Sequence, residues 1–470
     1  MTADRITGSL ASSRSDAPQL TTARGAALYI GALLGPGLLL LPGLAAAQAG
    51  PASLLAWVAL LCLSGLFAAV FSALGRKLPS AGGVMGYVIV GLGKRTGLAA
   101  GWSFVLAVVC GAPVVCLIGA SYVTSLTGGG LVSRAAVAAA LLVIVLALAA
   151  GGLRASAAAQ LVLVSLLLGI VVVAVAGSMP SARAANWTPF APHGWLSIGH
   201  AATTLMLSFV GWEAVAPLTT RFADPSRQLP RVIGIALAAT SALYLSLAIA
   251  TIGVLGSAAA TSVPLAGLLQ RSLGSSGPAI AAAAAIVLTL GTTNAYITGA
   301  ATMAGELARP SRAENETSLP VPADRRLQPR SGFFAAIAAA GLVLITLYGL
   351  GAVTISWLVA VPTTLFLAVY LAAMVGAIVV LRGAARAAAI PAALAVTVML
   401  AYCGWLLTIP AAIALVVVTA SAGRGSRTRQ RSAAAHPASI VGPCRRSPRP
   451  TGSTGISSST SFARDTASAC

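Results

Sequence analysis

The amino-acid sequence predicts an all-α integral membrane protein with twelve transmembrane helices. Of its 470 residues, 58% are hydrophobic and only 8% are charged, whereas a soluble domain carries about a quarter charged residues. So few charged side chains cannot cover a soluble globule of this size. The apolar segments are long and unbroken, unlike the roughly ten-residue alternating segments of an outer-membrane barrel. The chain is therefore expected to cross a lipid bilayer as helices.

Twelve apolar runs follow one another along the chain. Crossing a bilayer takes about 20 apolar residues, and most of the runs reach that length. The last two are short and meet at Cys403 and Gly404, which predicts a tight helical hairpin. The predicted spans are residues 25–47, 52–74, 98–123, 131–150, 157–177, 199–218, 232–255, 277–304, 333–350, 353–380, 387–402 and 404–420.

The basic residues support this number of spans. With twelve spans and the N-terminus inside, only Arg134, Arg183 and Arg271 fall outside, and the other 26 of the 29 Lys and Arg residues face the cytoplasm. Basic loops stay on the cytoplasmic side, so a miscounted span would scramble this asymmetry. The net charge of +20 is thus explained by topology and argues against nucleic acid as a partner. Both termini are expected in the cytoplasm, and the protein in the cytoplasmic membrane.

Two polar tails flank the apolar region. Residues 1–24 lack a compact apolar stretch ending in a small-residue cleavage site, so they are interpreted as a cytoplasmic tail rather than a signal peptide. Residues 25–421 form the membrane domain. Residues 422–470 are rich in Ser, Arg, Gly and Pro, which predicts a disordered cytoplasmic tail. Its arginines either bind anionic lipid or only fix the topology.

No metal, cofactor or catalytic centre is predicted. The six cysteines have no metal-ligand spacing and four of them lie inside apolar runs, where cysteine acts as a small core residue. The spans contain no His–Glu or Asp–Asp pair, and the chain has no nucleotide-binding loop. An enzyme embedded in the membrane would need such a constellation, so an enzymatic function is not expected.

The first span contains Gly35-Pro36-Gly37 at its centre. Pro36 removes a backbone donor, and the two glycines make it easier to leave the helix. Backbone groups freed in lipid are tolerated only where protein or a water-filled cavity surrounds them. The motif therefore predicts a helix that is interrupted next to a cavity. A kinked helix packed closely against its neighbours gives the same pattern.

The sixth span, with Gly211, Glu213 and Pro217 in one apolar run, favours the interrupted helix. Membrane proteins built from two inverted five-helix repeats interrupt their first and sixth spans at corresponding depths. Exposed helix amides suit a carboxylate, and freed carbonyls suit an ammonium group. Two such interruptions would form a binding site for a zwitterion.

Glu213 is the only acidic residue well inside a predicted span. An ionised carboxylate there costs at least about 2.5 kcal/mol, so burial favours its protonated form. The residue is suited to carrying a proton in one conformation and releasing it in another. A protonated glutamate that merely hydrogen-bonds to a neighbouring helix is the alternative.

Three motifs give the chain a resemblance to a known family. They are GALLGPGLLLLPGLAA at residues 31–46, LGRKLPSAGGV at residues 74–84 and FVGWEAVAPLTTRFADPSRQLPRVI at residues 209–233. The chain resembles the amino acid/polyamine/organocation (APC) superfamily of permeases, and within it the methionine and branched-chain amino-acid exporter branch. The resemblance implies the five-plus-five inverted-repeat, LeuT-like fold with discontinuous helices 1 and 6. It also implies movement of amino acids by exchange or coupled to protons.

The resemblance also implies site residues. The substrate carboxylate would lie at Gly35, Pro36 and Gly37, although many relatives have Ser or Thr where this chain has Pro36, so a hydroxyl and an amide donor are lost. Glu213 would be the gating or proton-linked residue. Apart from the resemblance, Tyr87 is a candidate gate aromatic that lines the path, or else an interfacial or packing residue. The ammonium side would lie on the backbone of Leu207, Ser208, Phe209, Val210 and Gly211, and Asn294 and Tyr296 would line the pathway or hydrogen-bond between helices.

The substrate is expected to be neutral. No acidic residue other than Glu213 lies midway along a span, and a cationic amino acid or polyamine would need a second carboxylate. Small and aliphatic residues dominate the spans, which favours methionine, leucine, isoleucine or valine. The predicted function is proton-coupled export of these amino acids by alternating access. An uptake permease or exchanger of the same fold is the alternative, and a membrane sensor or scaffold without transport is a more distant one.

Overall fold

The computed structural model describes residues 21–35, 37–78, 83–152, 157–212, 222, 224–307 and 331–419, all within the unit Met1–Ser421. These residues are mostly helical and contain no β-strand, which confirms the all-α class. The main helices are α2 (Thr22–Leu33), α3 (Gly37–Ala49), α4 (Ser53–Lys77), α5 (Gly83–Leu92), α6 (Lys94–Thr127), α7 (Leu131–Ala150), α8 (Ala157–Ser178), α9 (Ser197–Leu205), α11 (Pro225–Leu255), α12 (Pro264–Leu273), α13 (Gly277–Leu307), α14 (Ser331–Gly349), α15 (Ile355–Val380) and α16 (Gly383–Tyr402).

Nine helices in the described part of the chain are long and apolar enough to cross a membrane. Three of the twelve predicted spans are not among them as separate helices. The first is divided into α2 and α3, of 12 and 13 residues. The described part of the sixth contains only the nine-residue α9 and one 3-10 turn. The last is a shorter apolar helix, Gly404–Thr419. In the described residues the first run is divided, the sixth is covered only in part and the last is short, so none of the three forms a single long helix.

Two helices were not predicted from the sequence. α5 is separated from α6 by Gly93, whose φ of +89° favours glycine. The third predicted span, residues 98–123, corresponds to α6 but begins later than the helix, which starts at Lys94. α12 lies between the seventh and eighth predicted spans. It begins with Pro264 at its first position and ends at Gly274, which has a φ of +67°. Proline at the start and glycine after the end are ordinary helix boundaries, but the ten-residue segment is too short to be predicted as a membrane span.

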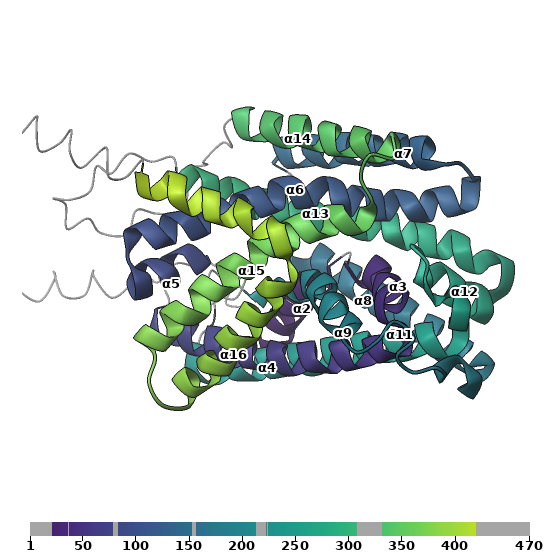
Figure 1. Ribbon diagram of the computed structural model, residues 1–470, viewed down its shortest axis with the longest axis horizontal. Coiled ribbons are helices and arrows are strands. Elements are labelled where there is room, and N and C mark those ends of the chain that lie inside the picture. The colour runs from purple at the N-terminus through teal and green to yellow at the C-terminus, as the bar shows by residue number, and fades with distance from the viewer. Residues whose placement is uncertain are drawn as a thin grey trace, which may run out of the picture. The chain divides into compact units, whose positions relative to one another are not determined.

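The long helices enclose the short ones. α6 packs against α7, α13 and α15, and α11 packs against α2 and α4. Figure 1 shows α2, α3 and α9 between the pair α6 and α13 on one side and the pair α4 and α11 on the other. The interrupted segments thus lie inside the helix bundle, where side chains rather than lipid surround their backbone.

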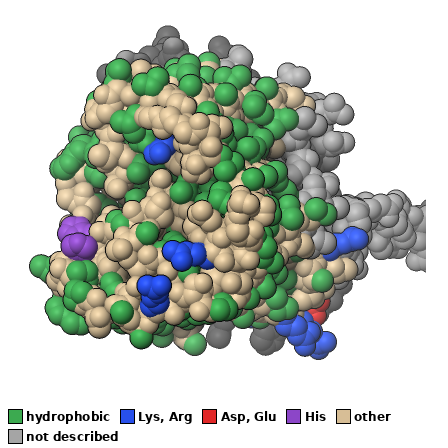
Figure 2. Space-filling view, turned by 90° about the vertical axis from the view of Figure 1, so that its right-hand side faces the viewer, with side chains coloured by type: hydrophobic (Ala, Val, Ile, Leu, Met, Phe, Trp, Pro, Cys, Tyr) green, Lys and Arg blue, Asp and Glu red, His purple; other side chains and the backbone are tan. Residues whose placement is uncertain are grey.

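Apolar side chains also cover the outside of the bundle. Figure 2 shows one end of the molecule, with hydrophobic side chains spread over the surface and a few separate basic ones. Large apolar side chains are also exposed along the lengths of the helices, as suits surfaces in contact with lipid. The exposed apolar residues include Val132, Val143 and Ile144 of α7, Leu342, Val343 and Leu347 of α14, and Ile390, Leu394 and Val398 of α16.

Gly43 is a close-packing point for the first interrupted span. A Cβ at this position of α3 would lie 1.9 Å from the carbonyl oxygen of Thr261, in the segment before α12. We expect Gly43→Ala to destabilise the protein by about 1–3 kcal/mol, the usual cost of overpacking, as a lower unfolding temperature of the purified protein. Gly234→Ala is the matched control, because an added methyl group there on α11 meets nothing within 4 Å. Equal unfolding temperatures for both variants would contradict the close contact.

Candidate functional site

The first apolar run is interrupted between Leu33 and Gly37. The Leu34 amide donates to the Ile30 carbonyl at 2.7 Å, and the Gly35 amide donates to the Leu33 carbonyl at 2.9 Å. Gly35 is half-buried, and an added Cβ there would meet nothing within 4 Å. The helix therefore ends beside open space at the glycine that the sequence singles out. Pro36 lies outside the described residues.

The sixth apolar run changes direction at Val210 and Gly211. After α9, a 3-10 turn covers Met206–Phe209, and Val210 is extended with a ψ of 137°. Gly211 has a φ of +138°, a conformation that side-chain-bearing residues rarely adopt. The glycine of the F-x-G-x-E motif thus permits the change of direction. Glu213 lies outside the described residues, so its predicted role is neither supported nor contradicted by the geometry.

The two interruptions contact each other. A Cβ on Gly37 would lie 2.6 Å from the Ser208 hydroxyl oxygen and 3.4 Å from Ser208 Cα, so only glycine permits this approach. Ser208 is 1% exposed. Within the described part of the chain, its hydroxyl oxygen has no hydrogen-bond partner. The contact brings the predicted carboxylate side and the predicted ammonium side of the site together.

Tyr244 of α11 reaches both interruptions. Its hydroxyl oxygen lies 2.7 Å from the carbonyl oxygen of Leu33, at the end of α2, and 2.9 Å from that of Ser208. The Leu33 carbonyl also accepts from the Gly35 amide at 2.9 Å, and Ser208 belongs to the 3-10 turn Met206–Phe209, so both carbonyls lie where the regular α-helix has ended. In a membrane interior, such groups need protein partners, and the tyrosine hydroxyl supplies one.

Three further tyrosines bind the interrupted backbone from other long helices. The hydroxyl of Tyr122, on α6, donates to the Leu39 carbonyl of α3 at 2.6 Å and accepts from the Leu265 amide of α12 at 3.3 Å. Around the second interruption, Tyr296 of α13 donates to the Val210 carbonyl at 3.4 Å. The Gly211 amide donates to the hydroxyl of Tyr370, on α15, at 3.2 Å.

Of these four tyrosines, only Tyr296 was named as a site residue from the sequence. The others could have been noticed as tyrosines within long apolar runs, because a buried tyrosine hydroxyl usually has a partner. The sequence gives no indication of which partner that is. The predicted pathway residue Asn294 is 8% exposed on α13, one turn or less from Tyr296, and Leu207 packs against the core.

Aromatic rings from α4 pack on the second interrupted segment and on tyrosines near it. The ring centroid of Trp57 lies 5.9 Å from that of Phe209 and 5.2 Å from that of Tyr244. Further along α4, Phe71 lies 6.5 Å from the predicted gate residue Tyr87 and 5.6 Å from Tyr370. Tyr87 is 1% exposed. Tyr87 therefore lies in a buried aromatic cluster with Phe71 and Tyr370. This position is compatible with either a gate or a packing residue.

A small cavity adjoins the end of α2. It has a volume of about 10 Å³, room for about one water molecule and far too little for an amino acid. The chain therefore has to move before this space could hold a substrate. The residues that line it come from α2, α8 and α13, together with the turn after α2, and are Gly31, Leu34, Leu163, Val164, Leu167, Leu288, Gly291 and Thr292.

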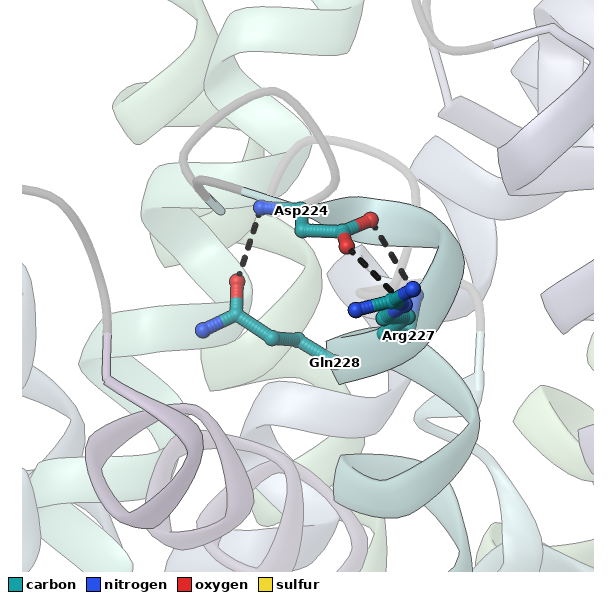
Figure 3. Close-up of polar contacts among 3 residues, drawn as sticks. All are labelled: Asp224, Arg227 and Gln228. Carbon is teal, nitrogen blue, oxygen red and sulfur yellow. Dashed lines mark hydrogen bonds and ion pairs between the residues drawn. The ribbon is translucent and has the colours of Figure 1, made fainter.

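The polar residues Asp224, Arg227 and Gln228, after the sixth run, form a helix cap (Figure 3). The Asp224 side chain accepts from the Arg227 amide at 3.3 Å, and the Asp224 amide donates to the Gln228 side chain at 3.1 Å. Pro225 occupies the first position of α11, as is common in helices. The ion pair between Asp224 and Arg227 spans 3.7 Å and is largely exposed, so it adds at most about 1 kcal/mol. This group starts α11 and is not part of the candidate site.

Comparison with known proteins identifies the family. A family model described as amino acid permease matches residues 20–435. The chain is 32% identical over 403 residues to the Bacillus subtilis protein named Uncharacterized amino acid permease YecA, covering 84% of this chain and 93% of that protein. It is 27% identical over 393 residues to the L-methionine/branched-chain amino acid exporter YjeH of Escherichia coli, covering 82% and 92%.

A shorter match points to the same class. The chain is 24% identical over 247 residues to the Branched-chain amino acid permease BcaP of Bacillus subtilis, covering 48% of this chain and 53% of that protein. The family and these relatives are transporters rather than enzymes, which confirms the resemblance inferred from the motifs. The chain belongs to the amino acid permease family and is a multi-pass membrane protein.

Proposed function

We propose that the protein is a secondary active transporter that moves neutral, apolar amino acids across the cytoplasmic membrane by alternating access. The observation that carries the proposal is the contact between the two interruptions, where Gly37 lies against Ser208. A zwitterion needs donors and acceptors at one point in the membrane, and two adjacent interrupted helices provide both.

The proposed architecture has twelve spans, ten of them in two inverted five-helix repeats of the LeuT-like type. The nine long apolar helices, the two interrupted runs and the shorter helix Gly404–Thr419 support this number. With twelve spans both termini are cytoplasmic, which agrees with the 26 basic residues on that side. The discontinuous helices would then be the first member of each repeat.

In the proposed site, the substrate carboxylate binds at Gly35, Pro36 and Gly37, where the start of α3 offers helix amides. The ammonium group binds the backbone carbonyls of residues 207–211, whose 3-10 and extended conformation leaves them outside a regular helix. Asn294 and Tyr296 line the same space from α13. Tyr296 supports this through its hydrogen bond to the Val210 carbonyl.

The charges near the site favour a neutral substrate. Within the described residues, the acidic side chains are Asp224, at the cap of α11, and Glu306, near the end of α13. Neither lies midway along a helix. With Glu213 assigned to the proton, a cationic side chain bound at the interruptions would be buried without a second carboxylate as counter-ion, which is costly. Methionine and the branched-chain amino acids have no such requirement.

Glu213 is the proposed proton-carrying residue, and export is the proposed direction. The relative named as an L-methionine/branched-chain amino acid exporter, which the chain matches over 82% of its length, supports export. The relative named as a branched-chain amino acid permease supports an uptake permease or exchanger as the second candidate. Direction in a cell follows from the gradients and the coupling, so a flux measurement decides between them.

We expect proteoliposomes containing the purified protein to release labelled methionine and leucine but not labelled arginine. An imposed proton gradient should accelerate the release, and collapsing the gradient with an ionophore should remove the acceleration. Liposomes without protein are the control. Flux that requires an amino acid on the opposite side, whatever the gradient, would indicate an exchanger. Binding without flux would indicate a sensor, and equal flux of arginine would contradict the substrate class.

A further inference from the structure

We propose that Tyr244 is a positioning residue that holds the two interrupted helices at the spacing the substrate requires. The proposal rests on the proposed function, because it assigns Tyr244 a part in building the same site. Its hydroxyl lies 2.7 Å from the Leu33 carbonyl and 2.9 Å from the Ser208 carbonyl. These two carbonyls belong to different interruptions, which are separated by about 175 residues of sequence but share this hydroxyl.

The chemistry of the hydroxyl explains why it sets a spacing. A tyrosine hydroxyl has one proton to donate, so two carbonyl oxygens compete for it. The Leu33 carbonyl also accepts from the Gly35 amide, but the Tyr244 hydroxyl is the donor placed between the two carbonyl oxygens. Without it, the two oxygens would approach each other with no proton between them, which is unfavourable in a medium of low polarity. The hydroxyl thus allows the end of α2 and the 3-10 turn Met206–Phe209 to approach. The direct contact of Ser208 with Gly37 follows from that approach.

The position of the hydroxyl is fixed by a helix that is not interrupted. Tyr244 is 1% exposed and lies in the second half of the 31-residue α11, which packs against α2. Its ring is held against Trp57 at 5.2 Å and Phe209 at 5.4 Å between centroids. Because these contacts hold the ring, the hydroxyl stays at a fixed position on α11. The two carbonyls that it contacts are therefore held near the same point of α11.

Tyr244→Phe removes the hydroxyl and keeps the ring packing. For the full-length protein in proteoliposomes, we expect the KM for methionine and leucine to rise about 3- to 10-fold, as for the loss of one buried hydrogen bond. The maximal rate should change less than about twofold. Tyr348→Phe is the matched control, because it deletes another buried tyrosine hydroxyl, one that accepts from Arg134 at 2.8 Å away from the interruptions.

A second measurement does not depend on transport. Hydrogen exchange of the purified protein should become about 2- to 10-fold faster in residues 30–38 and also in residues 204–211 of the Tyr244→Phe variant. It should change in neither segment for Tyr348→Phe. Faster exchange in only one segment, or in none, would overturn the proposal, as would an unchanged KM with a merely lower unfolding temperature.

A third variant covers the case in which Tyr244→Phe does not fold. Gly37→Ala should push the two interrupted segments apart while leaving Tyr244 intact. The new methyl group would lie only 2.6 Å from the Ser208 hydroxyl oxygen. We expect faster exchange in both segments and a raised KM for this variant too, and an unchanged KM would overturn the proposal. If the unaltered protein transports none of the amino acids, the proposed function fails, and the exchange experiment still decides whether Tyr244 joins the two segments.

Discussion

Replacing Glu213 by Gln is expected to abolish transport driven by a pH gradient while amino-acid exchange continues. Glutamine keeps the size and hydrogen-bonding ability of a protonated glutamate but cannot release a proton. An ionised carboxylate inside the membrane costs at least about 2.5 kcal/mol, so the native residue is expected to be protonated in one conformation and ionised only where water reaches it. Proteoliposomes measure both activities, as net efflux under a gradient and as counterflow without one.

The control for this variant is Glu306→Gln, which removes a carboxylate near the end of α13 rather than midway along a span. It should retain gradient-driven efflux. If Glu213 only hydrogen-bonds to a neighbouring helix, its Gln variant should behave in the same way as the control. Proton-linked efflux that survives the Glu213 substitution unchanged would therefore remove the residue from the mechanism.

Gly37→Ala should lower transport more than tenfold in a protein that still inserts and folds. The added methyl group would lie 2.6 Å from the Ser208 hydroxyl oxygen and 2.9 Å from Leu41 Cδ1. Relieving such an overlap costs about 1–3 kcal/mol, and 1.4 kcal/mol corresponds to tenfold in an equilibrium. The overlap acts where the two sides of the proposed site meet. The measurement is the initial rate of labelled methionine efflux, normalised to folded protein.

Gly234→Ala serves as the matched control here as well, because an alanine methyl group on that exposed part of α11 meets nothing within 4 Å. It should transport at the native rate. Native transport by Gly37→Ala would mean that Ser208 and its neighbours can move aside without consequence, and the two interruptions would then not form one site.

The sequence predicts the features that depend on local chemistry. Few charges and long apolar runs establish a helical membrane protein, and Gly35 and Gly211 mark the two places where the apolar runs leave regular helix, since backbone conformation there depends on the residue itself. The short helix α5 was missed because a helix of ten residues is too short to be recognised as a span. α12 was missed for the same reason, since it also has ten residues, and three of these are polar.

Tertiary partners could not be predicted from one sequence. Tyr244 and Leu33 are 211 positions apart, and nothing local to either residue specifies the other. The tyrosines of α6, α11, α13 and α15 meet the interrupted segments only because the helices pack as they do. The contact of Gly37 with Ser208 has the same origin. The glycines therefore predict where the two apolar runs leave the regular helix. They do not predict which side chains contact the backbone there.

The tyrosine contacts have a consequence for the environments in which the protein can work. In the described part of the chain, the tyrosine hydrogen bonds to the interrupted segments join hydroxyl and peptide groups, none of which carries a formal charge. Dissolved ions screen the attraction between exposed charges, with a Debye length of about 8–10 Å at physiological concentrations. They screen hydrogen bonds between buried neutral groups far less. Changes in ionic strength should thus leave these hydrogen bonds, and the spacing of the two interruptions, nearly unaffected.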